Sequence, residues 1–144
     1  SQEFGIRPGT PNMAGILSLQ YAVQQLQAPL YSARLSMLAG MRDEFETKLG
    51  FPVCHGKRLP GISNVWTGKP ATLLISELSR AGLAVSGMSA CKSGIDTESY
   101  VLKAMFGSEI DRASQSLRIS FSRLTKPEEA TEAVNIIERV ISTL

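Results

Sequence analysis

The sequence predicts an α+β fold, a two-layer sandwich in which helices pack mainly on one side of a small sheet. Apolar residues recur at helical spacing over two long stretches, residues 13–49 and 130–144. Apolar and polar residues alternate at residues 117–122, which indicates a half-buried strand. With 144 residues, the chain is long enough to bury a single hydrophobic core.

The composition is that of an ordinary globular protein, with 43% hydrophobic and 19% charged residues. The formal net charge of +2 is too small to indicate a nucleic-acid partner. No apolar run approaches the roughly 18 residues of a membrane span, and no signal-peptide pattern is present. Two cysteines without a regular framework suit a reducing compartment. We therefore expect a cytoplasmic protein with no membrane partner.

The first half of the chain predicts an arm, a long helical stretch and two strands. Residues 1–12 are rich in Gly and Pro, so we expect an N-terminal arm, followed by a single domain at 13–144. Helical spacing continues through residues 13–49, with a kink or break at Pro29. Residues 51–55 and 61–67 are predicted to be strands around a basic turn.

The second half predicts short helices between strands. A helix is expected to begin at Pro70 and to end before Gly82, followed by a strand at 83–86. A brief helix beginning at Thr97 is expected to end at Gly107.

The C-terminal part predicts a strand and a capped helix. Leu117, Ile119 and Phe121 alternate with polar residues, which places Arg118 on the polar face of a strand. The segment Thr125–Glu128 has the form of a capping box before the last helix. One apolar stripe then continues to the end of the chain.

One cysteine stands among small and flexible residues, in the segment Gly87–Gly94. Glycine and serine on both sides reduce the bulk that would bury a thiol. Lys92 follows Cys91 and favours its thiolate, the nucleophilic form. The pattern suits a nucleophile, but a free cysteine in a polar turn has the same local pattern.

Four segments resemble those of one enzyme family, in the same order along the chain. Ser89–Gly94 resembles the active-cysteine loop of the cysteine desulfurases, and Gln2–Asn12 resembles their arginine-x-glycine-threonine segment. Arg58–Val65 is similar to a strand beginning typical of the family, and Ser116–Ser122 resembles its carboxylate-binding arginine strand. The family belongs to the class V aminotransferase superfamily and depends on pyridoxal phosphate.

The resemblance implies the fold of the small C-terminal domain of that superfamily, and it implies a reaction. Sulfur is taken from L-cysteine, leaving alanine and a persulfide on Cys91 for acceptors such as iron–sulfur cluster scaffolds. By the same resemblance, Arg118 binds the substrate carboxylate. Thr10 contacts the cofactor phosphate in trans, across the homodimer of the intact enzyme.

In the family, the lysine that binds the cofactor follows a histidine, upstream of the matched segments. The single histidine here, His55, is followed by Gly56. We therefore expect a C-terminal domain fragment that needs an N-terminal cofactor domain and a sulfur-acceptor protein. The chain alone is expected to bind no cofactor and to be inactive.

Other interpretations of these residues stay open. The pattern around Arg118 also suits a solvated surface arginine on a strand. Arg123 is the nearby competitor for the substrate role. Thr10 also suits a simple turn before the first helix. Cys54 and His55 are adjacent, but neighbours in a strand point to opposite faces, so no metal site is expected.

The function also has an alternative of another class: a stand-alone sulfur-carrier or interaction domain without catalytic activity. A lyase or transaminase of the same superfamily is a further alternative. The sequence does not distinguish cysteine from selenocysteine as the substrate, and it does not identify the sulfur acceptor.

Overall fold

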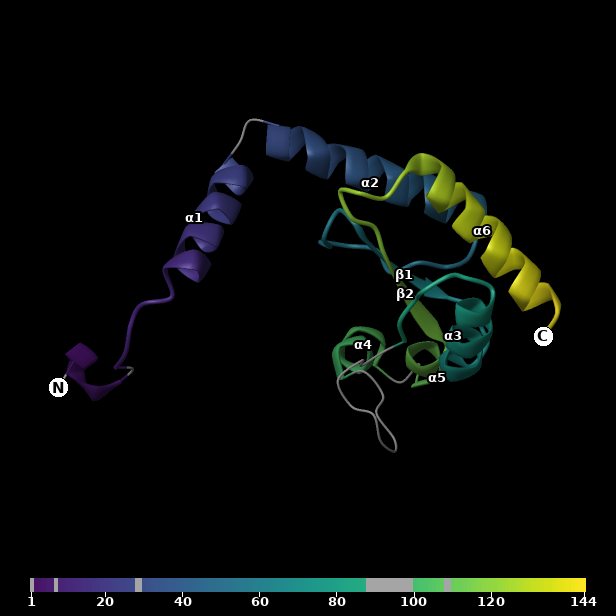
Figure 1. Cartoon of the computed structure of the whole chain (residues 1–144). Coiled ribbons are helices and arrows are strands. Elements are labelled where there is room, and N and C mark those ends of the chain that lie inside the picture. Colours follow the sequence, from purple (N-terminus) through teal and green to yellow (C-terminus); the bar gives the residue numbers. More distant parts are fainter. Residues whose placement is uncertain (1, 7, 28–29, 88–99, 108–109) are drawn as a thin grey trace. The chain divides into compact units, whose positions relative to one another are not determined.

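The computed structural model describes residues 2–6, 8–27, 30–87, 100–107 and 110–144. The chain divides into two compact units, Ser1–Arg34 and Leu35–Leu144 (Figure 1). The expected boundary between an arm at 1–12 and a domain at 13–144 stays a prediction.

The first unit contains a short 3-10 helix, η1 (Gln2–Gly5), and the helix α1 (Met13–Gln27). The side chain of Asn12 starts α1, because its Oδ1 accepts a hydrogen bond from the N–H of Gly15 at 3.0 Å. No residue of α1 is buried. Pro29, where a break was expected, lies outside the described residues, and the next helix, α2 (Leu30–Leu49), begins directly after it.

The sheet of the second unit consists of two antiparallel strands, β1 (Ile62–Trp66) and β2 (Ser116–Ser120). Each strand has one further neighbour through a single bridge: Val53 pairs with Val65, and Ser86 pairs with Arg118. The pairing of these two strands positions the candidate site.

The strands predicted at 51–55 and 83–86 were wrong in extent, since each is reduced to one bridging residue. Pro52 has no N–H to donate, so pairing beside β1 cannot extend past it. The N–H of Leu83 instead donates to Leu78 O at 2.9 Å and closes the end of α3 (Ala71–Arg80). Gly82, with φ +89, makes that turn.

Three helices of the second unit contribute to the core against one face of the sheet: the second half of α2, α3 and α6 (Pro127–Ser142). The buried residues of this core include Phe45, Val65, Leu74, Leu117 and Ile137. Two short helices, α4 (Tyr100–Phe106) and α5 (Ile110–Ser114), pack against each other, and α5 was not predicted. The α+β prediction is thus confirmed.

The capping box of α6 lies one residue later than predicted. Lys126 is the N-cap, and its N–H donates to Oε2 of Glu129 at 2.8 Å. Thr125, the expected cap, instead accepts a hydrogen bond from the N–H of Ser122.

A polar network fixes the segment that leads into β1. Arg58 donates two hydrogen bonds of 2.7 Å to the carboxylate of Glu46, and Ser63 Oγ donates a third to Oε1 at 2.6 Å. Arg42, which is buried, donates to the carbonyls of Leu59 and Pro60. Because α2 supplies Arg42 and Glu46, this network ties the beginning of β1 to that helix.

Candidate functional site

Arg118 lies at the centre of β2, with its side chain on the face of the sheet opposite the core. Leu117 and Ile119 are buried, whereas Arg118 is exposed, as the alternation predicted. The backbone of Arg118 is paired on both sides: it lies opposite Asn64 of β1, and it exchanges hydrogen bonds with Ser86 at 2.7 and 3.2 Å. The strand therefore holds the base of this side chain in a defined position.

The guanidinium of Arg118 forms no hydrogen bond or ion pair within the described part of the chain. Other arginines of the same unit are engaged: Arg42 and Arg58 in the network before β1, and Arg80 with Glu77. A guanidinium on a fixed backbone, with its donors uncommitted, suits a planar anion such as a carboxylate. Arg123, its competitor, is also exposed, but it lies in the turn after β2.

Asn64 and Ser86 are neighbours of Arg118 that the sequence interpretation did not connect with it. Asn64 lies directly opposite Arg118 in the antiparallel register, so the two side chains share one face. Asn64 is half-buried. The alternation in β1 places Asn64 on the polar face, but only the register places it beside Arg118.

Cys91, the predicted nucleophile, lies outside the described residues. The last residue described before Cys91 is Gly87, which packs closely on α3. A Cβ added at Gly87 would lie 2.9 Å from Ile75 Cδ1. Ser86, one residue earlier, is the residue paired with Arg118. Gly87 thus directly follows the residue that pairs with Arg118.

Thr10 belongs to the first unit, where it is exposed. Gly9 before it has φ +124, a conformation that favours glycine. A hydroxyl and the N–H after a glycine are donors that fit a phosphate oxygen, so these residues fit one contact to the phosphate of pyridoxal phosphate. Thr10 and Arg118 lie in different units.

Cys54 is a free, half-buried cysteine whose N–H donates to Asn64 O at 3.0 Å, while the adjacent His55 is exposed. The described residues contain no group of three or more His, Cys, Asp or Glu side chains suited to a metal ion. Cys54 thus lies beside β1 through this backbone hydrogen bond.

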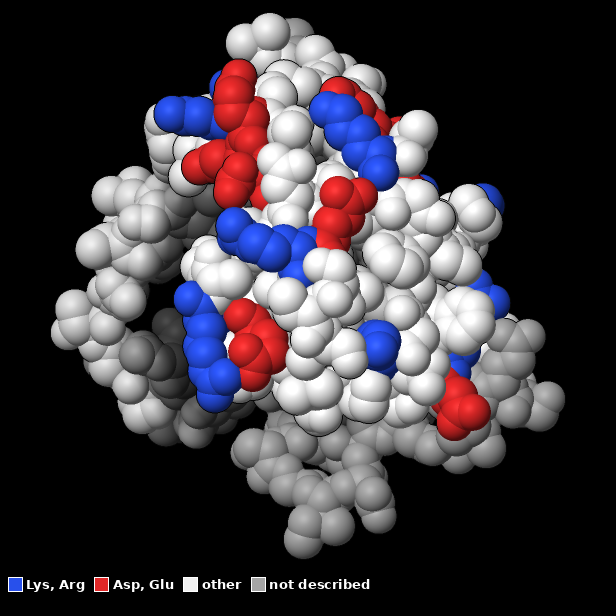
Figure 2. Space-filling view, turned by 90° about the vertical axis from the view of Figure 1, so that its right-hand side faces the viewer, with Lys and Arg blue, Asp and Glu red and all other residues white. Residues whose placement is uncertain are grey.

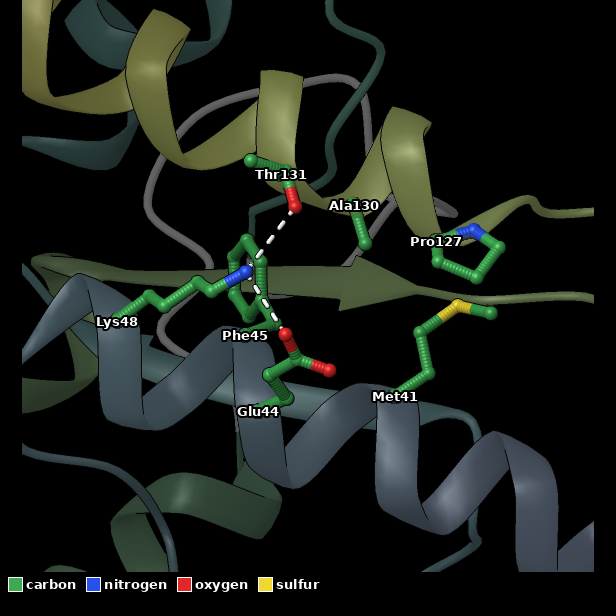
Figure 3. Close-up of a pocket in the computed structure, with 7 residues that line it drawn as sticks. All are labelled: Met41, Glu44, Phe45, Lys48, Pro127, Ala130 and Thr131. Carbon is green, nitrogen blue, oxygen red and sulfur yellow. Dashed lines mark hydrogen bonds and ion pairs between the residues drawn. The ribbon is translucent and has the colours of Figure 1, made fainter.

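A small hollow lies between α2 and α6 (Figure 3). Lys48 closes one end of it through an ion pair with Glu44 at 2.7 Å and a hydrogen bond to Thr131 at 3.2 Å. The volume of about 10 Å³ has room for about one water molecule. Since none of the predicted site residues lines it, this hollow is separate from the candidate site.

The charged side chains on the face shown in Figure 2 are of both signs and interspersed. This distribution accords with the small net charge and offers no broad field of one sign. None of the described helices has the length and apolar character needed to cross a membrane.

Sequence comparisons connect nearly the whole chain with one group of enzymes, although no family model matches it. The putative cysteine desulfurase IscS 1 of Bacillus subtilis is 33% identical over 153 aligned positions, covering 99% of this chain and 40% of the relative. The cysteine desulfurase NifS of Azotobacter vinelandii is 30% identical, covering 99% of this chain and 37% of the relative.

Solved structures agree on the fold. A NifS-like protein superposes with a TM-score of 0.80 at 25% identity, covering 99% of this chain and 37% of the other. A NifS-like protein from Rickettsia africae gives a TM-score of 0.77 at 21% identity, which supports the fold alone.

The fold is therefore the α+β fold found in NifS-like proteins. Over nearly its whole length the chain is similar to the C-terminal part of cysteine desulfurases, the family that the resemblance indicated. It spans about two fifths of the length of the curated relatives that it matches.

Proposed function

We propose that this chain supplies the C-terminal part of a pyridoxal-phosphate-dependent cysteine desulfurase, in which Cys91 takes sulfur from L-cysteine. The observation that supports this most is the match to cysteine desulfurases over nearly the whole chain. The uncommitted guanidinium of Arg118, on a paired strand, adds support from the structure.

The proposed reaction needs no external oxidant. The thiolate of Cys91 attacks the sulfur of L-cysteine, so that a sulfur–sulfur bond forms while the carbon–sulfur bond of the substrate breaks. The electron pair of the broken bond stays with the substrate carbon, which is protonated and becomes the methyl group of alanine. The sulfur of Cys91 is oxidised and the substrate carbon is reduced, giving alanine and a persulfide.

Arg118 binds the substrate carboxylate in this proposal. A guanidinium can hold a carboxylate through two parallel hydrogen bonds, which fixes both the position and the orientation of the amino acid. The backbone of Arg118 is held by β1 on one side and by Ser86 on the other. Little backbone freedom is therefore lost when the side chain binds the substrate.

The covalent chain keeps Cys91 within reach of this substrate position. Cys91 follows Ser86 by five residues, and an extended chain spans at most about 3.5 Å per residue. The Cα of Cys91 therefore stays within roughly 17 Å of the backbone paired with Arg118. This limit is compatible with a thiolate that collects sulfur at the substrate and then presents it to an acceptor.

Thr10 and the N–H that follows Gly9 hold the cofactor phosphate of the opposite subunit in the proposed homodimer. When bound, pyridoxal phosphate supplies an electron sink for the bonds broken at the substrate carbons. A lysine for the cofactor would come from the N-terminal part of the enzyme, which is the first proposed partner. The others are a sulfur-acceptor protein, such as an iron–sulfur cluster scaffold, and the proposed location is the cytoplasm.

The test uses a single polypeptide in which this chain replaces the matched 40% of the Bacillus subtilis relative. Sulfide released from L-cysteine is measured with pyridoxal phosphate and dithiothreitol, with the unaltered relative as the reference. Cys91→Ser is expected to lower the turnover at least 100-fold, because serine provides no thiolate. Cys54→Ser, the matched control, is expected to change it less than twofold.

Turnover that survives Cys91→Ser would contradict the proposed role of Cys91. Sulfide release by this chain alone would contradict the expectation that it needs the N-terminal cofactor domain. A chimera that binds pyridoxal phosphate but gives no Cys91-dependent turnover would favour the alternative of a sulfur-carrier or interaction domain.

A further inference from the structure

Asn64 of β1 lies as close to Arg118 of β2 as an antiparallel pair allows. The N–H and the C=O of Arg118 both bond to Ser86, on the side of β2 away from β1. Asn64 and Arg118 therefore form a pair that exchanges no backbone hydrogen bonds. The hydrogen bond from the N–H of Phe121 to Gly61 O, three residues along the ladder, keeps the same alternation. In such a pair the Cα atoms are about 4.5 Å apart, and the side chains come closer than in a hydrogen-bonded pair.

The side chain of Asn64 differs from the other buried and half-buried polar side chains of the two strands. Those of Ser63, Trp66 and Ser116 each donate a hydrogen bond, at 2.6, 3.1 and 2.7 Å. The amide of Asn64 forms none with the part of the chain that the structure describes. A half-buried amide in this state has lost water without gaining a partner, which is unfavourable. A ligand that accepts a hydrogen bond from Asn64 would remove this cost.

Ser86 is the other cross-strand neighbour of Arg118, and it fits a shared ligand less well. The two residues exchange both backbone hydrogen bonds, so their Cα atoms are about 5.5 Å apart. The hydroxyl of serine is also shorter than the amide of asparagine and has one donor instead of two. Asn64 is therefore the better placed of the two neighbours.

A carboxylate is the ligand that suits Asn64 and Arg118 together. Its two oxygens accept about four hydrogen bonds, and a bidentate guanidinium uses two of these. The Nδ2 group of Asn64 adds two donors and no charge, so it binds the same anion without repelling Arg118. An acidic residue at this position would pair with the guanidinium and exclude the anion.

We infer that Asn64 is a second substrate-binding residue, whose side-chain amide donates a hydrogen bond to the carboxylate that Arg118 holds. The inference rests on the proposed function insofar as the carboxylate is that of L-cysteine. Donors from two neighbouring strands fix the plane of the carboxylate as well as its position. Asn64 thereby selects for amines that carry a free carboxylate.

Binding without turnover tests this inference in the chimera carrying Cys91→Ser. It is titrated with L-alanine, the proposed product, and with ethylamine, which lacks only the carboxylate. The absorbance of bound pyridoxal phosphate gives Kd for both. Asn64→Ala is expected to raise Kd for L-alanine at least tenfold, since a hydrogen bond to a charged group is lost, and Kd for ethylamine less than twofold. Asn135→Ala, at an exposed asparagine of α6, is the matched control and is expected to change each Kd less than twofold.

The double variant shows whether the two side chains hold the same group. Once Arg118→Ala has loosened the carboxylate, Asn64→Ala has less left to remove. The double variant is therefore expected to raise Kd for L-alanine at least threefold less than the product of the two single effects. Single effects that multiply without loss would contradict a shared carboxylate.

Two further outcomes would overturn the inference. In one, Asn64→Ala leaves Kd for L-alanine unchanged. In the other, it raises Kd for L-alanine and for ethylamine equally, which identifies a structural role. Because this readout needs no turnover, a loss specific to the carboxylate together with failed desulfuration by the chimera with Cys91 intact would reject the proposed function alone.

Nuclear magnetic resonance of the chain alone keeps the inference testable if the chimera does not bind the cofactor. The chain is titrated with sodium acetate, with sodium chloride at the same ionic strength as the reference. The signals of the Asn64 Nδ2 group and of the Arg118 Nε–H are expected to shift together, with one apparent Kd. A shift of the Arg118 signal alone, or of neither signal, would overturn the inference.

Discussion

Two helices of nearly equal length, α1 with 15 residues and α6 with 16, behave differently within this chain. Six residues of α6 are buried in the core of its unit, and its other face carries charges such as Glu132, Glu138 and Arg139. No residue of α1 is buried, and it carries no charge. An amphipathic helix such as α6 thus completes the core of its own unit, whereas α1, apolar and without charge, contributes no buried residue to a core.

The largest expected difference between the two helices is in the effect of truncating one apolar side chain. Ile137→Ala in α6 removes a side chain that is 1% exposed, and should lower the free energy of unfolding of this chain by about 3 to 4 kcal/mol. Leu19→Ala in α1 should change it by less than about 0.5 kcal/mol, because the side chain is exposed. Urea denaturation of the chain alone measures both values, and equal losses would remove the contrast.

A smaller effect is expected from the polar network that holds the segment before β1. Glu46→Gln removes the charge that pairs with Arg58, and should cost about 2 to 3 kcal/mol of unfolding free energy. Glu77→Gln at the exposed pair with Arg80 is the matched control, expected to cost less than about 0.5 kcal/mol. Chemical denaturation at neutral pH distinguishes them, and similar costs would show that the network contributes little.

Two glycines should respond to alanine with opposite signs. A Cβ at Gly61 would overlap the carbonyl oxygen of Phe121, so Gly61→Ala should destabilise the second unit by about 1 to 3 kcal/mol. Gly40 lies in α2 with open space around it, so Gly40→Ala should stabilise by about 0.5 kcal/mol or more. Thermal unfolding followed by circular dichroism gives the sign, and a stabilising Gly61→Ala would contradict this packing.

The smallest effect on stability is expected for substitution of Arg118, whose proposed role is in substrate binding. Arg118→Ala should change the unfolding free energy by less than about 0.5 kcal/mol, because the side chain is exposed. In the chimera it should raise KM for L-cysteine at least tenfold, since a bidentate contact to the carboxylate is lost. Arg123→Ala is the control for a nearby exposed arginine, and a KM unchanged by Arg118→Ala would contradict the substrate role.

Local patterns predicted the elements whose structure depends on nearby residues. The apolar stripe of α6 and the alternation around Arg118 were confirmed, because each reflects burial against a core. The cap of α6 was misplaced by one residue, since the side chain of Thr125 is used by Ser122 instead. The predicted strand around Val53 failed at Pro52, whose missing N–H limits the pairing.

Non-local pairing could not be predicted from these patterns. The neighbours of Arg118, Asn64 and Ser86, are set by the register between segments far apart in the sequence. The five-residue helix α5 is too short to produce a periodic signal. The roles of Cys91, Arg118 and Thr10 stay predictions, which come from the resemblance.

The central claim is that Cys91 receives sulfur from L-cysteine, and mapping of the persulfide tests it most directly. The chimera is treated with L-cysteine and pyridoxal phosphate, its thiols and persulfides are alkylated, and the peptides are weighed by mass spectrometry. The account predicts one additional sulfur atom on the peptide containing Cys91, and none on the peptide containing Cys54. Additional sulfur on Cys54 alone, or on neither peptide while alanine is produced, would contradict it.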